Sequence, residues 1–385
     1  MPQQFSSREM LSRLVAFDTT SRGSNLELIS FVEDYVGGYG IASRRIPNAE
    51  GTKANLLITI GPDTPGGIVL SGHTDVVPVD GQDWLTQPFN MVEKDGKLFG
   101  RGTSDMKAFS AVILALLPEF AKAPLKTPVH IALSYDEEVG CLGVRPMIAD
   151  IVKSVPMPRL AIIGEPTDMK VVNAHKGIRS FRTTVTGREA HSSQTDKGVN
   201  AVMVAAELIM HLSSLADEMR RRGDPSGRFD PPYTSVQSST IEGGTALNIL
   251  ARHCTFQWEF RYLPGTSQEE IVDRFNAHAR DVILPRLRLI APEADIVTNV
   301  RAHVPALTAR DGCPAEALAK QLTGRNHAEA VAYGTEAGLF QEVGIPSVVC
   351  GPGNIQQAHK PNEFIEISQV AACEAFIRRL IHQLR

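Results

Sequence analysis

Acidic and imidazole side chains follow four apolar segments of this chain. These groups are His73 and Asp75 after GIVLSG, Glu137 and Glu138 after VHIALSYD, Glu165 after LAIIG, and His359 in the loop after SVVCG. A further carboxylate, Asp105, closes the glycine-rich stretch GRGTSD. Carboxylates gathered a few ångströms apart cannot all stay ionised without a compensating charge. A divalent metal supplies that charge, so this set of residues predicts a metal site.

The composition of the set narrows the kind of metal site. Mixed imidazole and carboxylate ligands suit zinc, and cobalt or manganese less exclusively. The number of carboxylates favours two ions over one, and two-metal hydrolases hold their ions about 3.5–4 Å apart. The chemistry expected of such a site is activation of water for attack on an amide carbonyl.

The segments that carry these residues read as strands alternating with helices. Strands are expected at 55–60, 67–70, 129–135, 160–163 and 347–350, and helices at 108–120, 144–153, 314–322 and 368–384. Ser6 and Glu9 form a capping-box pattern that opens a helix at the start of the chain. This alternation predicts an α/β fold with a mostly parallel sheet flanked by helices. Ligand groups collect beyond the carboxyl ends of such strands, so the candidate residues should share one edge.

The rhythm changes in the middle of the chain. Period-two strands are expected at 180–186, 234–241, 253–262 and 295–300, with helices at 199–220 and 268–284. The order β-α-β-β-α-β predicts a ferredoxin-like α+β module. We therefore expect a discontinuous catalytic domain, 1–178 and 305–385, interrupted by an inserted dimerisation or lid domain at 179–304.

Five short motifs carry a family resemblance that covers essentially the whole chain. HTDVVP, GRGTSDMK, DEEVG, GEPT and the late GPG…AH stretch resemble, in order, the zinc-dependent aminoacylase and carboxypeptidase family. The resemblance implies a hydrolase of linear amides with two zinc ions, for which cobalt can substitute. It implies His73 and Glu165 as ligands of one ion, Glu138 and His359 as ligands of the other, Asp105 as the bridge, Glu137 as general base, and Asp75 as the residue that orients His73.

Residue chemistry agrees with these implied roles. An HxD spacing on a strand puts His73 and Asp75 on one face, and a ligating imidazole needs its second N–H anchored. Neighbouring Glu137 and Glu138 point to different sides, so one can bind metal while the other moves protons. Glu137 would take a proton from the water that bridges the metal ions, which leaves a hydroxide. It would later give that proton to the leaving amine.

Residues of the inserted domain are expected to meet the substrate. By resemblance, His191 in TGREAHSS stabilises the oxyanion, either in its own chain or across a homodimer formed through the inserted domain. Asn248 in GGTALNIL and Arg261 in FRYLPG resemble contacts to the substrate carboxylate. Arginine suits that role because its planar fork donates two parallel hydrogen bonds. A strand-neighbour ion pair is the alternative for Arg261.

One late segment bears on the substrate. YGTEAGLF at 333–340 resembles the acetylornithine-deacetylating branch of the family, which converts N-acetylornithine and water to ornithine and acetate in arginine biosynthesis. Glu336 would face the ornithine side-chain ammonium, or it is a helix-start glutamate favoured by the dipole. A succinyl-diaminopimelate desuccinylase and a broad N-acyl-amino-acid amidohydrolase are the enzymatic alternatives. A metal-free binding module is the non-enzymatic one.

Composition excludes several other classes. The formal net charge is -4 with both signs interspersed, which does not indicate a nucleic-acid or membrane partner. The N-terminal segment lacks a secretory pattern, and the longest apolar run is too short to span a bilayer. Five scattered cysteines form no CxxC pair, which fits free thiols in a reducing cytoplasm.

Overall fold

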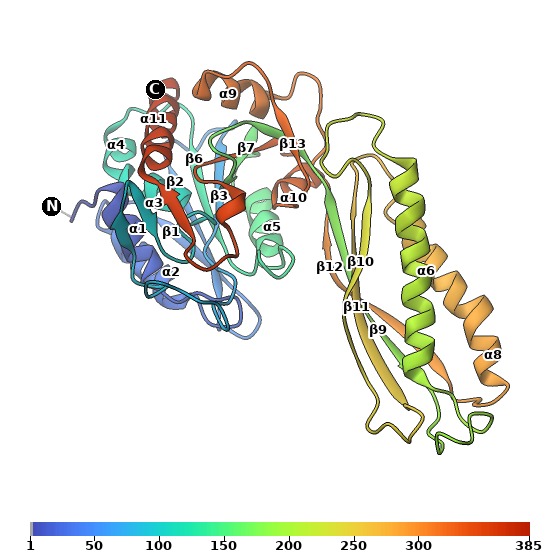
Figure 1. Ribbon diagram of the computed structural model, residues 1–385. Helices are drawn as coiled ribbons and strands as arrows, with labels where there is room; N and C mark the ends of the chain where they lie inside the picture. The colour runs from blue at the N-terminus through green and yellow to red at the C-terminus, as the bar shows by residue number, and fades with distance from the viewer. Residues whose placement is uncertain (1–2) are drawn as a thin grey trace. The chain divides into compact units, whose positions relative to one another are not determined.

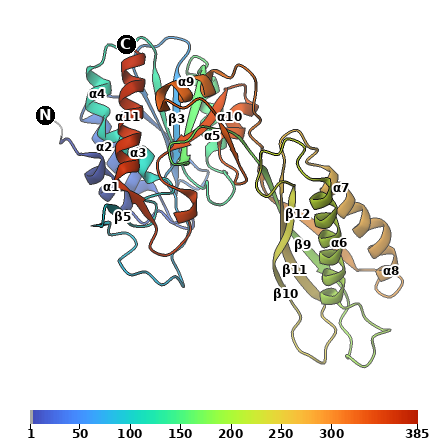
Figure 2. The same ribbon diagram turned by 45° about the horizontal axis from the view of Figure 1, so that its top comes forward.

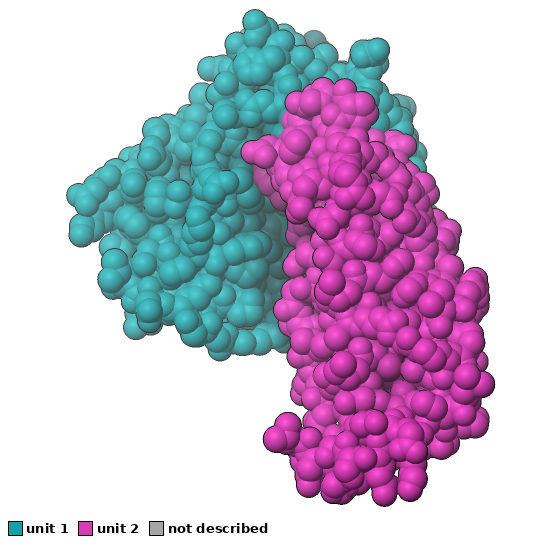
Figure 3. Space-filling model, turned by 45° about the vertical axis from the view of Figure 1, so that its right-hand side comes forward, with its two compact units in different colours: residues 1–174, 307–330, 335–385 teal, residues 175–306, 331–334 magenta. Residues whose placement is uncertain are grey.

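The computed structural model of the chain describes residues 3–385. They fall into two compact units, coloured separately in Figure 3. Of the described residues, unit 1 comprises 3–174, Leu307–Ala330 and Thr335–Arg385, and unit 2 comprises His175–Ala306 and Val331–Gly334. The segment 179–304, expected to be an inserted domain, lies within unit 2. Its assignment as a dimerisation or lid domain stays a prediction.

Unit 1 is built on an eight-stranded mixed sheet (Figure 1). In spatial order its strands are β1 (Ser43–Pro47), β2 (Ala54–Ile60), β6 (Val129–Ser134), β3 (Ile68–His73), β7 (Leu160–Pro166), β14 (Ser347–Gly351), β8 (Val172–His175) and β13 (Glu329–Val331). The central strands β6, β3, β7 and β14 pair in parallel, whereas β1, β2 and β8 pair antiparallel. The predicted α/β fold with a mostly parallel sheet is confirmed.

Helices cover both faces of this sheet. One hydrophobic core joins one face to α1 (Ser7–Val15), α2 (Leu26–Gly37), α3 (Lys107–Ala115), α9 (Pro314–Thr323) and α11 (Ile367–Gln383). Helices α5 (Val144–Ser154) and α10 (Ala337–Glu342) contact each other and pack on β6, β7 and β14 from the other side. Side chains along β6 alternate between the two faces of the sheet. Ile131 and Leu133 pack into the large core, whereas Ser134 faces α10 on the other side.

Two predicted helices are wrong in extent. The helix expected at 108–120 is broken at Leu116 into α3 and α4 (Leu117–Lys122). The helix expected at 268–284 consists of α7 (Glu270–Ala277), the π-helical η1 (His278–Ile283) and α8 (Leu284–Arg288). A proline lies in the first turn of both α4 and α8, where the missing N–H ends the preceding helix. The predicted capping box at Ser6 and Glu9 is confirmed.

Several short elements were not predicted. They include a small antiparallel sheet of β4 (Val92–Lys94), β5 (Lys97–Phe99) and β15 (Phe364–Glu366), together with the 3-10 turn η2 (Ile355–Gln357). Helix α2 and strands β1, β8 and β13 were missed as well. The sheet that contains β5 and β15 matters for function, because it joins the segment before Asp105 to the segment after His359.

Unit 2 is an antiparallel sheet with helices on one face (Figure 2). The strand order is β10 (Ser235–Gly243), β11 (His253–Tyr262), β9 (Gly177–Thr186) and β12 (Asp295–Val304), and α6 (Ala201–Arg222) follows β9. This is the predicted β-α-β-β-α-β order of a ferredoxin-like module. Within the described residues, no helix combines the length and apolar character that crossing a bilayer requires.

The core of unit 2 contains a buried polar contact that holds its largest side chain. Trp258 stacks on Phe181 with ring centroids 4.2 Å apart. Its indole Nε1 donates to the hydroxyl of buried Thr183 at 3.0 Å. Burying an N–H is tolerable only with such an acceptor.

This contact generates a stability prediction. Thr183→Val should lower the free energy of unfolding by about 1–3 kcal/mol, because the buried indole N–H loses its acceptor. Thr184→Val, on the opposite face of the same strand, is the matched control and should change it much less. Calorimetric unfolding of both variants would measure this, and equal losses would contradict the expectation.

Candidate metal centre

The site lies at the carboxyl edge of the four parallel strands of unit 1. His73 is the last residue of β3, and Glu165 lies near the end of β7. Glu137 and Glu138 follow β6, and His359 follows β14 in the loop after η2. The glycines of these motifs allow close packing, since a Cβ on Gly164 would lie 2.0 Å from the ring of Phe109. Adjacent strand ends therefore bring together residues that are far apart in the sequence.

Asp105 lies between the two imidazoles. Its Oδ1 is 3.2 Å from His73 Nε2, and its Oδ2 is 3.3 Å from His359 Nε2. Glu138 Oε2 lies 3.0 Å from His359 Nε2, and Glu165 Oε1 lies 3.8 Å from His73 Nε2. One carboxylate thus offers an oxygen to each of two histidine–glutamate pairs, which is the arrangement expected of a bridging ligand.

The donor atoms are close enough to share cations. His73, Glu137 and Glu165 each offer a ligand atom within 4.8 Å of the others, and so do His73, Asp105 and Glu138. The donor set, nitrogen and carboxylate oxygen, fits zinc-like ions. The first grouping leaves Glu137 with two possible roles, since its carboxylate lies near enough to act as a ligand or as a base.

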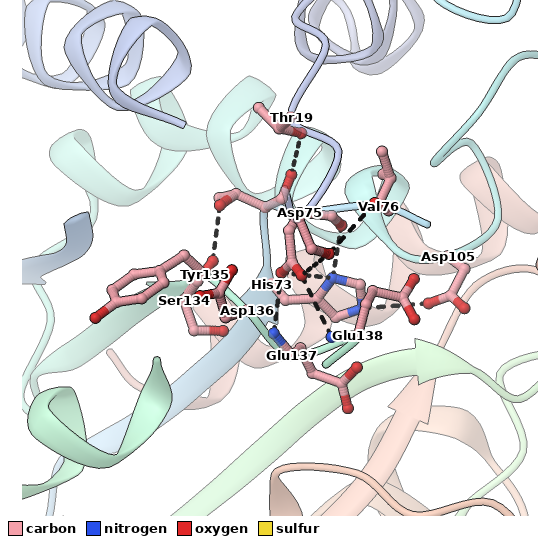
Figure 4. A network of polar contacts seen from close by, with 12 residues as sticks. Thr19, His73, Asp75, Val76, Asp105, Ser134, Tyr135, Asp136, Glu137 and Glu138 are labelled. Carbon is pink, nitrogen blue, oxygen red and sulfur yellow. Dashed lines mark hydrogen bonds and ion pairs between the residues drawn. The ribbon is translucent and has the colours of Figure 1, made fainter. Parts of the chain in front are cut away.

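Asp75 holds the backbone of the acidic turn, residues 136–138, more directly than it holds His73. The Nδ1 of His73 is 2.9 Å from the main-chain oxygen of Asp75, whereas the Asp75 carboxylate is 3.6 Å away (Figure 4). That carboxylate accepts the main-chain N–H groups of Glu137 at 3.1 Å and Glu138 at 3.3 Å, and the hydroxyl of Ser21 at 2.7 Å. Asp75 therefore links the strand that carries His73 to the two glutamates.

Protonation follows the crowding of charge. Hydrogen bonds that His359 donates to the carboxylates of Asp105 and Glu138 raise its pKa to about 10. Burial, reinforced by neighbouring carboxylates, raises the pKa of Glu137 to about 8 and that of Glu165 well above its usual range. Burial opposes ionisation of Asp105, but the two imidazoles outweigh it and hold its pKa below the usual range. The cluster favours added positive charge, as a cation site should.

Glu336 lies beneath the cluster. It precedes α10, is 1% exposed, and accepts hydrogen bonds from Ser71 of β3 at 3.0 Å and from Ser134 of β6. Both carboxylate oxygens are thus engaged by the strands that carry His73 and Glu137. The predicted contact of Glu336 with a substrate ammonium stays a prediction, and its role at a helix start agrees with its position.

The three residues expected to meet the substrate lie in unit 2, in two places. His191 bridges to Ile249, and Ser192 N–H donates to the main-chain oxygen of Asn248, so His191 and Asn248 are neighbours. Both are exposed. Arg261 lies near the other end of β11, opposite Ile178, and its Nε is 3.3 Å from Glu259. The structure therefore brings His191 and Asn248 together but not Arg261 with them.

Sequence reasoning missed the residues that support the site. These include Ser21, Lys53, Ser71, Gln82, Arg101, Ser134, Cys141 and Glu363. Lys53, for example, pairs with Asp136 at 2.5 Å and so fixes the start of the acidic turn. Local patterns contain no signal for these contacts, because all of them except the short-range one between Cys141 and Glu137 join distant parts of the chain.

Comparison with known proteins agrees with this geometry. The profile of peptidase family M20/M25/M40 matches residues 69–383, and the chain belongs to this family of hydrolases. Among its curated relatives is an acetylornithine deacetylase of Proteus mirabilis (strain HI4320), 35% identical over 373 residues that cover 95% of this chain and 92% of the relative. The predicted family resemblance and the prediction of an enzyme are confirmed.

Solved structures show the same fold. An M20 family metallo-carboxypeptidase from Sulfolobus solfataricus superposes with a TM-score of 0.76 at 16% identity, covering 98% of both chains. A Bacillus subtilis protein described as a dinuclear metal-binding peptidase of the M20 family gives 0.65 at 16% identity, also covering 98% of both chains. These likenesses establish the fold of the whole chain.

The position of Asp105 generates a prediction about metal content. Asp105→Asn offers only one good ligand oxygen, so the purified variant should retain at most about half the metal of the parent protein. Atomic emission after dialysis measures this, with Asp217→Asn on the exposed face of α6 as the control. Full metal retention in Asp105→Asn would show that this residue does not bridge.

Proposed function

We propose that this chain is a dinuclear metal amidohydrolase that converts N-acetylornithine and water to ornithine and acetate. The observation that carries the proposal is Asp105, whose two oxygens face the imidazoles of His73 and His359. Relatives that bear the name acetylornithine deacetylase support the substrate. Such a reaction would supply ornithine for arginine biosynthesis in the cytoplasm, and the five free cysteines agree with a reducing compartment.

The proposed ligand set uses the two pairs around Asp105. His73 and Glu165 would hold one ion, Glu138 and His359 the other, and Asp105 would serve both. Zinc fits these donors best, and cobalt can substitute. When bound, the ions would polarise the amide carbonyl and lower the pKa of water, as two-metal hydrolases require.

Glu137 is the proposed general base. Its carboxylate is buried beside the cluster and accepts a hydrogen bond from Cys141 Sγ at 3.2 Å. Asp75 accepts the main-chain N–H of Glu137 and so holds this residue in place. Among the described contacts, the Glu137 carboxylate forms no ion pair with a lysine or an arginine. It would take a proton from the attacking water and deliver it to the leaving amine nitrogen.

The proposed substrate contacts favour a homodimer. Between His253, near the His191 end, and Arg261, strand β11 runs about 27 Å at the rise of an antiparallel strand. One acylated amino acid is much shorter than that span. If His191, Asn248 and Arg261 all contact the same substrate, at least one must come from a second chain. We therefore propose that His191 and Asn248 act across a dimer that forms through unit 2.

A substrate panel tests the proposed reaction. Acetylornithine, succinyl-diaminopimelate and acetylmethionine are supplied to the zinc-loaded and cobalt-loaded protein, and released amine is quantified. The highest kcat/KM is expected for acetylornithine. Preference for the succinylated substrate would indicate a desuccinylase, and similar values for all three would indicate a broad amidohydrolase.

Glu137 generates a second prediction. Glu137→Gln should lower kcat by about 100-fold or more while metal content stays unchanged, because the variant keeps the shape but cannot move a proton. Steady-state kinetics and atomic emission measure the two quantities. Loss of metal together with activity would instead assign Glu137 as a ligand, as its proximity to His73 and Glu165 allows.

The buried carboxylate of Glu336 generates a further prediction. If its carboxylate faces the ornithine ammonium, Glu336→Gln should raise KM for acetylornithine more than for acetylmethionine, since only the first carries that charge. If it only holds Ser71 and Ser134, kcat should fall equally for both substrates. Kinetics on the two substrates separate these roles.

A further inference from the structure

The two histidines of the metal centre are held in very different ways. His73 belongs to a strand with neighbours on both sides, and its side chain is 1% exposed. His359 lies in a loop with φ of 63°, and its side chain is 53% exposed. A loop residue in the left-handed region needs outside contacts to stay in one conformation. Those contacts should decide how well His359 binds a cation.

A buried ion pair fastens the segment that follows His359. Arg101 and Glu363 are each 1% exposed, with Nη1 and Oε2 2.7 Å apart. Glu363 Oε1 also accepts the main-chain N–H groups of Ser104 at 2.8 Å and Asp105 at 3.1 Å. The carboxylate of Glu363 therefore holds the backbone of the proposed bridging ligand.

Gln82 extends this network to His359 itself. Its Oε1 accepts from Arg101 Nη2 at 2.7 Å and from Trp84 Nε1 at 3.0 Å. Its Nε2 donates to the main-chain oxygen of His359 at 3.0 Å. The Arg101 guanidinium lies over the Trp84 ring, 5.1 Å from its centroid. With both ends of the Gln82 amide engaged, its orientation is determined.

Hydrogen bonds thus run without a break from Asp105 through Glu363, Arg101 and Gln82 to His359. All five residues belong to unit 1. None of the three intermediate side chains is among the proposed ligands. The network joins two loops that no shared strand holds at that point, and it engages the main chain, which sets where both ligand side chains begin.

We propose that Gln82, Arg101 and Glu363 are positioning residues that set the affinity of the cation held by Glu138 and His359. The inference rests on the proposed function, because it takes those two residues as ligands. Groups that orient metal ligands change metal affinity by about 10–100-fold when removed. The cation held by His73 and Glu165 should depend on them less, since strands β3 and β7 fix those two residues.

Gln82→Leu tests the proposal with little risk to folding, because Gln82 is only half-buried. Gln87→Leu is the matched control, an exposed glutamine in the same loop. Metal-free protein is titrated with Co²⁺ by visible absorption and with Zn²⁺ against a competing chelator. We expect the weaker of the two binding steps, assigned to the cation held by Glu138 and His359, to lose about 10–100-fold in affinity in Gln82→Leu but not in Gln87→Leu. The tighter step should stay within about threefold.

Arg101→Lys and Arg101→Met extend the test to the ion pair. Lysine keeps the charge beside Glu363 and should restore part of the weaker binding step, whereas methionine should not. Thermal unfolding of the metal-free proteins is measured in parallel. Equal weakening of both binding steps, in proportion to lost metal-free stability, would overturn the proposal in favour of general structural damage.

The outcomes separate this inference from the proposed function. If the parent protein itself takes up no second cation, the dinuclear proposal fails. If the parent binds two cations and Gln82→Leu binds them as Gln87→Leu does, the dinuclear proposal stands and the positioning role is rejected.

Discussion

The need to neutralise buried carboxylates at one sheet edge constrains the rest of unit 1. The carboxylates of Asp105, Glu138 and Glu165 are almost fully enclosed, Glu137 beside them is half-buried, and their described cationic partners are the imidazoles of two histidines. Such crowding is stable only where positive charge is supplied, by protons or by metal ions. Parallel strands are well suited to create this situation, because every strand in the group ends at the same edge.

Rigidity is distributed unequally around that edge. Strands β3 and β7 carry His73 and Glu165 directly, so the sheet itself fixes them. Asp105 and His359 lie in loops. There, hydrogen bonds from the side chains of Glu363 and Gln82 to the main chain take the place of strand pairing. Buried polar groups of this kind are costly unless fully paired, which makes each one specific for a single arrangement. Asp75 is a further example, because its carboxylate accepts hydrogen bonds from two backbone N–H groups of the acidic turn.

In unit 2 the constraint is the length of the sheet compared with the size of a small substrate. Its four-stranded sheet separates His191 and Asn248 from Arg261 along β11. A long sheet can therefore offer polar groups at both ends, yet a small substrate can contact only one end of any single copy. The proposed dimer would relate two copies by a two-fold axis, the commonest symmetry of oligomers, and could bring opposite ends of two identical sheets to equivalent sites. If the proposed dimer forms, substrate recognition by this chain would depend on its assembly.

The amino-acid sequence determined the parts that local pattern encodes. Apolar segments followed by His73, Glu138 and Glu165 were sufficient to predict strands, the shared edge and metal chemistry, because strand ends are set by residues close in sequence. Only the tertiary structure decided that Asp75 binds backbone, that Glu336 lies beneath the cluster, and that Gln82 reaches His359. Those contacts connect residues separated by up to hundreds of positions, and their energies depend on burial and orientation that no local period records.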